Sequence, residues 1–132
     1  MFQRVSSLGG DVQPFEWYLL TDGEGATRGE ALVQTNGRLT KCGATATPEF
    51  IAERTQAAEA TSVTPLPVTR ITEGDDFTTT STATVASSLV GSKVTLGADG
   101  LTVTATTTSG VFEVSSTDGV TGGGVVHGYF RR

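Results

Sequence analysis

Short runs of alternating apolar and polar residues, separated by turn signals, fill most of this chain. The clearest pair is residues 31–35 and 38–42, which flank Asn36-Gly37. Asn-Gly between two such runs predicts a two-residue hairpin turn, because both central residues of a type I′ turn need a positive φ. We expect Leu32 and Leu39 to share the buried side of this hairpin.

Further strands are predicted on both sides of the hairpin. They cover residues 15–21, 49–55, 88–96, 101–106, 111–115 and 125–131. Residues 63–71 contain Pro65 and Pro67, which cannot donate to a sheet ladder, so this stretch is predicted to be an edge strand or an extended crossing. Turns recur about every 8–12 residues, the spacing of a β-sandwich or a small β-barrel. We therefore expect a mainly β fold with little helix.

The N-terminal residues differ from the remainder of the chain. Residues 1–14 are mostly polar and contain Gly9-Gly10, which predicts a flexible arm. Residues 15–132 are predicted to form one all-β domain, or two β subdomains over 15–72 and 77–132. A chain of 132 residues is long enough to bury one modest core.

The first predicted strand is rich in aromatic residues. Its alternation favours Phe15, Trp17 and Leu19 as a core-facing set. The alternative interpretation is that Trp17 and Tyr18 form an exposed contact platform, of the kind that carbohydrate-binding modules use for stacking.

Charge and hydropathy narrow the partners to be expected. The net charge is −5, whereas an electrostatic grip on nucleic acid needs clustered Lys and Arg. No segment approaches the ~20 apolar residues of a membrane span, and residues 1–10 lack the apolar core of a signal peptide. We therefore expect synthesis in the cytoplasm, with neither a nucleic-acid nor a membrane partner.

Few residues of the chain are suited to catalysis or metal binding. His127 is the single histidine and Cys42 the single cysteine, so a cluster of histidines, a two-histidine relay and an intramolecular disulfide cannot form. Cys42 is interpreted as a small buried residue and His127 as a sheet-face residue. Asp75 and Asp76 are interpreted as part of a solvated turn rather than a calcium site. The sequence thus predicts a protein that is not an enzyme and that needs no metal or cofactor.

One stretch of the chain resembles a known family. It comprises Gly29-Glu30-Ala31-Leu32-Val33, Asn36-Gly37-Arg38-Leu39-Thr40-Lys41-Cys42-Gly43 and Thr47-Pro48-Glu49-Phe50-Ile51-Ala52. This stretch resembles the core of head decoration (capsid cement) proteins of tailed bacteriophages, including the lambda-like group, where G-x-A-L-V, G-x-L and P-x-x-I-A recur in this order. The Thr-rich second half of the chain has no counterpart in that pattern.

The resemblance implies a virion structural protein with a β-tulip-like first half. Such a protein, made in the host cytoplasm, binds the major capsid protein on the exterior of the expanded capsid and stabilises the head against internal DNA pressure. The resemblance also implies a homo-oligomer, a trimer in preference, whose N-terminal arm orders on the shell. The residues then expected to bind the capsid are Phe2, Arg4, Val5, Val12 and Phe15. Removal of residues 1–14 is expected to abolish shell binding without unfolding the domain.

The same residues are also compatible with a second function. The chain is alternatively a carbohydrate-binding or adhesive β-module of a phage fibre or a cell surface. In that case Trp17 and Tyr18, or a Thr-rich face, would provide the platform.

Overall fold

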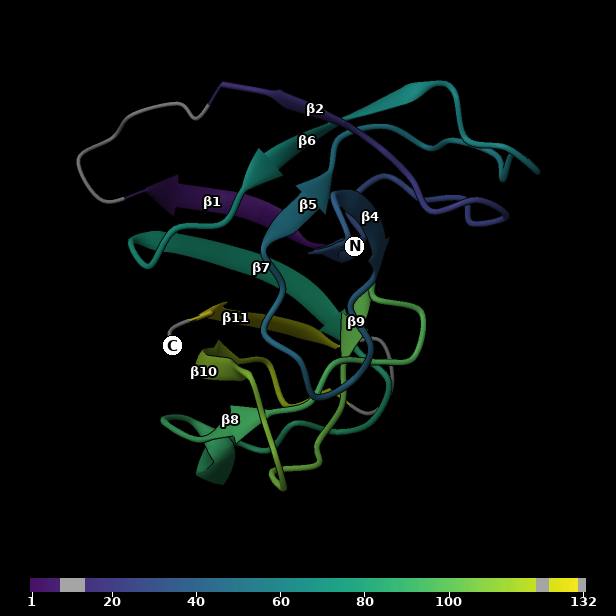
Figure 1. Ribbon diagram of the computed structural model, residues 1–132. Helices are drawn as coiled ribbons and strands as arrows, with labels where there is room; N and C mark the ends of the chain where they lie inside the picture. Colours follow the sequence, from purple (N-terminus) through teal and green to yellow (C-terminus); the bar gives the residue numbers. More distant parts are fainter. Residues whose placement is uncertain (8–13, 121–123, 131–132) are drawn as a thin grey trace.

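A computed structural model describes residues 1–7, 14–120 and 124–130, and it contains two β-sheets that pack against each other (Figure 1). The strands are β1 Gln3–Ser7, β2 Glu16–Leu19, β3 Ala31–Thr35, β4 Arg38–Lys41, β5 Phe50–Ala52, β6 Pro65–Arg70, β7 Asp75–Ser81, β8 Lys93–Val94, β9 Thr102–Val103, β10 Phe112–Thr117 and β11 Val125–Phe130. The helix of the described residues is a single 3-10 turn, η1, at Ser87–Leu89. The predicted mainly β fold is confirmed as a sandwich, since neither sheet closes into a barrel over the described residues.

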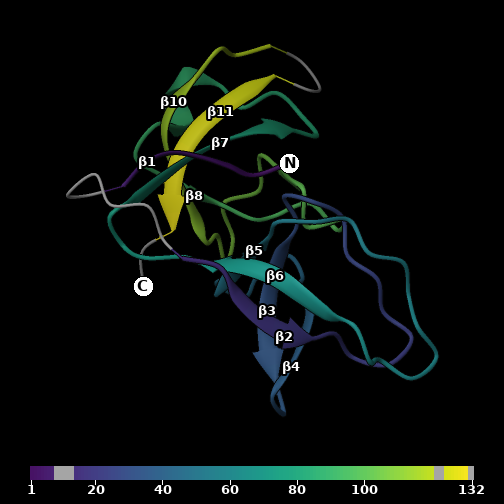
Figure 2. The same ribbon diagram turned by 90° about the horizontal axis from the view of Figure 1, so that it is seen from above.

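The two sheets follow the two halves of the sequence, with one exception. Sheet I has the strand order β2-β6-β5-β3-β4 and is antiparallel throughout. Sheet II has the order β1-β7-β11-β10-β8, with β9 pairing parallel to β7. The exception is β1, which comes first in the chain and lies beside β7 (Figure 2).

The β3–β4 hairpin is formed as predicted. Asn36 and Gly37 have φ of 52° and 78°, the positive values of a type I′ turn. Leu32 and Leu39 are both fully buried on the same face of sheet I. This local prediction is confirmed because the turn and the alternation both lie within a dozen residues.

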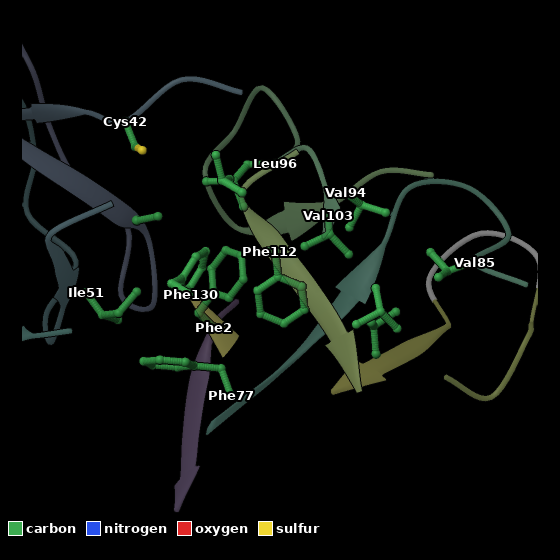
Figure 3. Close-up of a cluster of buried hydrophobic side chains, with 14 residues drawn as sticks. Phe2, Cys42, Ile51, Phe77, Val85, Val94, Leu96, Val103, Phe112 and Phe130 are labelled. Atoms are coloured by element: carbon green, nitrogen blue, oxygen red, sulfur yellow. The ribbon is translucent and has the colours of Figure 1, made fainter. Parts of the chain in front are cut away.

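The larger hydrophobic cluster lies between the two sheets (Figure 3). Its centre is formed by four phenylalanines of sheet II and the N-terminus, with ring centroids 5.1–5.8 Å apart: Phe2, Phe77, Phe112 and Phe130. Sheet I contributes Ala31, Cys42 and Ile51 to the same cluster. Both halves of the chain therefore bury side chains in a shared core.

A second cluster lies on the other face of sheet I. It consists of Leu20, Ala26, Leu32, Leu39, Phe50, Ala52, Leu66 and Val68. Successive residues of a strand point to opposite faces, so Ile51 enters the first cluster and its neighbours Phe50 and Ala52 enter the second. Burial on both faces explains why all of β5 is apolar.

The N-terminal residues do not form a flexible arm over residues 1–7. Phe2 is only 2% exposed, and its N–H donates to the carbonyl of Gly29 at 3.0 Å. Burial of one aromatic side chain contributes about 1.5–3 kcal/mol, and β1 adds ladder hydrogen bonds with β7. Phe2 therefore anchors a segment whose other residues are mostly polar. Residues 8–13 of the predicted arm lie outside the described residues.

The proline-containing strand β6 is not at an edge, so that prediction is wrong. It lies between β2 and β5. The carbonyl of Pro67 accepts the N–H of Glu53 at 3.0 Å, one residue past Ala52, where β5 ends. The nitrogen of Pro67 carries no hydrogen, and it faces β5 at the point where the β5–β6 ladder stops. A proline is therefore tolerated at this position of β6.

The Thr-rich half contains less strand than predicted. Residues 88–96 form the end of η1 and the two-residue β8, and residues 101–106 contain only β9. Gly91 has a φ of 88°, which interrupts the first of these segments. Asp75 is also misassigned by the sequence, since it is fully buried at the start of β7 rather than solvated in a turn.

Candidate functional site

The exposed aromatic residues of the first sheet lie on β2 and immediately before it. Trp17 is 57% exposed and Phe15 is 55% exposed, whereas the other five phenylalanines are at most 2% exposed. The interpretation of Phe15, Trp17 and Leu19 as a core face is therefore wrong. The opposite face of β2 is buried instead, because Tyr18 packs on Phe50 with ring centroids 5.4 Å apart.

The exposed apolar side chains continue from β2 to the start of β6. Trp17 pairs with Pro67 and Leu19 with Pro65, and paired residues share a face of the sheet. Pro65 is exposed, and Val63, just before β6, is 69% exposed. We call Phe15, Trp17, Val63 and Pro65 the β2 surface. Exposed apolar side chains that gather on one strand and beside its neighbour are a feature of interaction sites.

The face of β2 opposite Trp17 carries an ion pair. Arg70 of β6 donates from Nε to Glu16 Oε2 at 3.0 Å and from Nη2 to Glu16 Oε1 at 2.9 Å. The hydroxyl of Tyr18 donates to the same carboxylate at 2.6 Å. The hydrogen bonds from Arg70, and then that from Tyr18, lower the pKa of Glu16. A two-pronged contact of this type restricts β2 in orientation as well as position.

The two residues of the predicted platform are separated by the sheet. Trp17 points to the exposed face, whereas Tyr18 is half-buried on the other face against Phe50. Adjacent residues of a strand cannot share a face. Phe15 therefore replaces Tyr18 as the aromatic neighbour of Trp17 on the exposed face.

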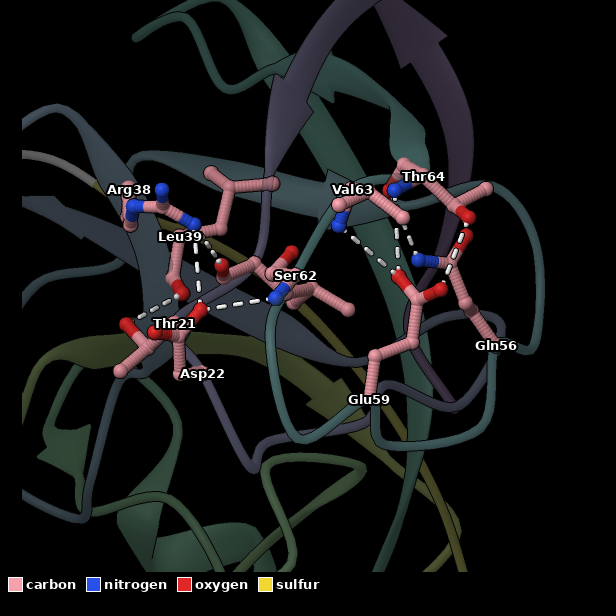
Figure 4. A network of polar contacts seen from close by, with 10 residues as sticks. Thr21, Asp22, Arg38, Leu39, Gln56, Glu59, Ser62, Val63 and Thr64 are labelled. Carbon is pink, nitrogen blue, oxygen red and sulfur yellow. Dashed lines mark hydrogen bonds and ion pairs between the residues drawn. The ribbon is translucent and has the colours of Figure 1, made fainter.

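The loop that carries Val63 is held by a polar network (Figure 4). Asp22 Oδ1 accepts the N–H of Ser62 at 2.7 Å. Glu59 accepts the N–H groups of Val63 and Thr64 at 3.3 and 3.1 Å, and also the Thr64 hydroxyl at 3.0 Å. The bonds from Thr64 and Val63 lower the pKa of Glu59. Val63 is therefore exposed on a loop whose backbone is pinned.

Two of the predicted capsid-binding residues have structural roles. Phe2 belongs to the core between the sheets. Arg4 forms an ion pair with Asp75 at 3.0 Å and also donates to the carbonyl of Arg70 at 2.9 Å. Because Asp75 is fully buried, loss of Arg4 would leave its charge uncompensated in the core.

The remaining predicted capsid-binding residues have different positions. Val5 is 54% exposed, at a bulge in the pairing of β1 with β7. Phe15 belongs to the β2 surface. Val12 lies outside the described residues. The sequence could not indicate Val63, because nothing local distinguishes it from the apolar residues of β6.

The single cysteine and the single histidine differ in their exposure to solvent. Cys42 is buried and its thiol donates to the carbonyl of Ala46 at 3.0 Å; burial raises its pKa to about 12. His127 is exposed on β11. Within residues 1–7, 14–120 and 124–130, no three His, Cys, Asp or Glu side chains are grouped as metal ligands. The same residues contain no helix with the length and apolarity needed to cross a bilayer.

One cleft contains a buried carboxyl group. The cleft, of about 440 Å³, is lined by Glu24, Glu30, Lys41 and loop residues around Ala57. Glu30 is 4% exposed; its Oε1 accepts the N–H of Thr27 at 3.1 Å, and its Oε2 has no hydrogen-bond partner among the described residues. Burial raises the pKa of Glu30. Because Oε2 is itself shielded from solvent, it is not presented to a ligand in the cleft.

Comparison with known proteins identified no relative: no family model, no curated protein and no solved structure matches the chain.

Proposed function

We propose that this chain is a virion structural protein that decorates the outer surface of the expanded head of a tailed bacteriophage. It would bind the major capsid protein through the β2 surface and act by binding rather than by catalysis. The observation that carries this proposal is the exposure of Phe15 and Trp17 in a chain that buries its other five phenylalanines. The resemblance over residues 29–52 supports it, because those residues form β3, β4 and β5 of the same sheet.

The size of the β2 surface fits attachment to a repeating lattice. Aromatic side chains bury 150–250 Å² each, so at their exposure Phe15 and Trp17 offer about 200 Å² together. At about 25 cal/mol per Å² this area yields about 5 kcal/mol. Association costs an estimated 4–15 kcal/mol, so one surface alone binds weakly. A homotrimer with three such surfaces on a rigid shell would gain the missing affinity by avidity.

Co-sedimentation with bare, expanded capsids tests the proposal. Phe15→Thr and Trp17→Thr together remove the aromatic area, and we expect at least a tenfold loss of affinity, since each anchor contributes about 1 kcal/mol or more. Val90→Thr is the control, because Val90 is 45% exposed and directly follows η1. The helical turn η1 lies beside β8, at the end of the molecule opposite β2 (Figure 1). Equal binding by the double variant and wild type would contradict the role of the β2 surface.

The carbohydrate-binding alternative is favoured by one observation. Trp17, the single tryptophan, is exposed beside Phe15 on one face, which is the geometry of a stacking platform. Titration of Trp17 fluorescence with cell-surface polysaccharides of the host distinguishes the two functions. A saturable change with a polysaccharide, without binding to capsids, would replace decoration by glycan binding.

A further inference from the structure

We propose that β2 binds an extended segment of the shell subunit as an added strand of sheet I. This inference rests on the proposed function and specifies how the β2 surface makes its contact. It follows from the direction of the backbone groups of β2, from the protection of the other sheet edges, and from the area available.

The backbone of β2 directs unpaired groups away from the sheet. Pro67 turns its carbonyl toward β5, where it accepts the N–H of Glu53. Trp17, the β2 partner of Pro67, therefore sits in a pair without hydrogen bonds, and its N–H and C=O point to the open side of β2. Phe15 has the same orientation by alternation. Among the described residues, no group bonds to these backbone atoms of Phe15 and Trp17.

The open part of the edge is short and well defined. Leu20 is bridged to Leu39, and the N–H of Thr21 donates to the carbonyl of Leu39 at 2.9 Å, so β4 covers the C-terminal end of β2. Before this bridge and its neighbour Leu19, Phe15 and Trp17 present two donors and two acceptors. Groups repeated at every second residue of a strand match the spacing of another extended chain.

The other strands at the ends of the sheets are protected against such pairing. β1 is bulged, and β8 is only two residues long. β4 ends in Lys41, whose N–H is bonded by Glu24. On β2 the single charged residue is Glu16, and it is held by Arg70 on the opposite face. Proteins normally block edge strands with charges, bulges or covering loops, and β2 is unbulged and directs its one charge to the opposite face, which leaves its edge open to a partner strand.

The small aromatic area beside the open edge argues against a second copy of this chain as the occupant. A stable interface buries about 800 Å² per partner, and the two aromatic side chains offer about 200 Å². The occupant must therefore belong to a partner that makes further contacts, as a shell subunit does. Because the charges beside β2 are already paired, its segment is expected to present uncharged, apolar residues toward Phe15 and Trp17.

Two variants at the same position separate the backbone from the side chain. Phe15→Thr removes the ring and keeps the N–H, whereas Phe15→Pro removes both, and proline is tolerated where the N–H faces away from the sheet. We expect Phe15→Pro to bind bare expanded capsids about fivefold more weakly than Phe15→Thr, the value of one lost hydrogen bond of about 1 kcal/mol. Circular dichroism verifies that both variants are folded.

Hydrogen exchange provides the second measurement. The amides of Phe15 and Trp17 are expected to exchange rapidly in the free protein and slowly on the shell, while the inward-facing amide of Tyr18 is protected in both. Equal affinity of the two variants, or fast exchange of Phe15 and Trp17 on the shell, would overturn the added strand and leave the decoration function standing. A concentration-dependent dimer that protects these amides without capsids would replace the shell segment by a second copy. Failure of the wild type to bind capsids would overturn both proposals.

Discussion

Glu30 illustrates how a single residue departs from what its type predicts. The sequence places it in the resemblance segment, at the start of the hairpin, with no sign of burial. In the fold, the loop residue Gly100 lies over it and accepts the N–H of Ala31, so the carboxyl group of Glu30 is 4% exposed. Burial has the largest effect on the pKa of Glu30 and raises it, against the hydrogen bond from Thr27, which lowers it.

Substitution of Glu30 should therefore stabilise the protein in a pH-dependent way. The pKa of Glu30 is higher in the folded chain than in the unfolded chain, so ionisation favours unfolding as the pH rises through the folded-state value. Glu30→Gln keeps an acceptor for Thr27 and carries no charge. We expect it to raise the free energy of unfolding at pH 7 by about 1 kcal/mol.

The pH profile provides the control for this prediction. Below the pKa of the unfolded chain, Glu30 is neutral in both states, and wild type and variant should become equally stable. Urea unfolding at several pH values measures the difference. A variant that is less stable than wild type at pH 7 would show that Glu30 has a stabilising charged partner.

At the scale of strands, features that depend on neighbouring residues could be predicted from the sequence, whereas contacts between distant residues could not. The β3–β4 hairpin follows from Asn36-Gly37 and the alternation beside it. The orientation of β2 depends on Phe50, which is distant in sequence and fills the space under Tyr18. The pairing of β1 with β7 likewise joins segments about 70 residues apart. The candidate site was predicted only in part, since alternation alone cannot tell which face of a strand is covered.

The attachment of the N-terminal strand β1 can be tested by its effect on stability. Phe2→Ala removes a buried ring that packs on Phe112 and Phe130, and it should lower the free energy of unfolding by about 3–5 kcal/mol. Val5→Ala in β1, where Val5 is 54% exposed, should change it by less than about 0.5 kcal/mol. Removal of residues 1–7 is accordingly expected to destabilise the fold, in contrast to the behaviour of a flexible arm. Equal stability of the two variants in thermal unfolding would contradict the anchoring of β1.

At the scale of the whole molecule, the shared core determines how the two halves behave. The sequence left open one domain or two subdomains over 15–72 and 77–132. Ala31 and Ile51 of sheet I pack in the same cluster as Phe77 and Phe112 of sheet II. Unfolding of one sheet alone would expose the cluster residues of the other sheet to water. The two sheets are therefore expected to unfold together.

Unfolding with two probes tests this coupling. Trp17 reports on sheet I, and far-UV circular dichroism reports on both sheets. We expect a single transition with coincident midpoints in urea, the behaviour of one cooperative unit. Two separated midpoints would assign the halves to separate subdomains.

We propose that this protein binds the outer surface of a tailed-phage head. The measurement that tests it most directly is electron cryomicroscopy of bare, expanded capsids of the parent phage after incubation with an excess of the purified chain. The account predicts density for the sandwich at fixed, symmetry-related positions on the outer surface, with β2 and the Val63 loop toward the shell. Capsids that remain bare at saturating protein concentration would contradict it.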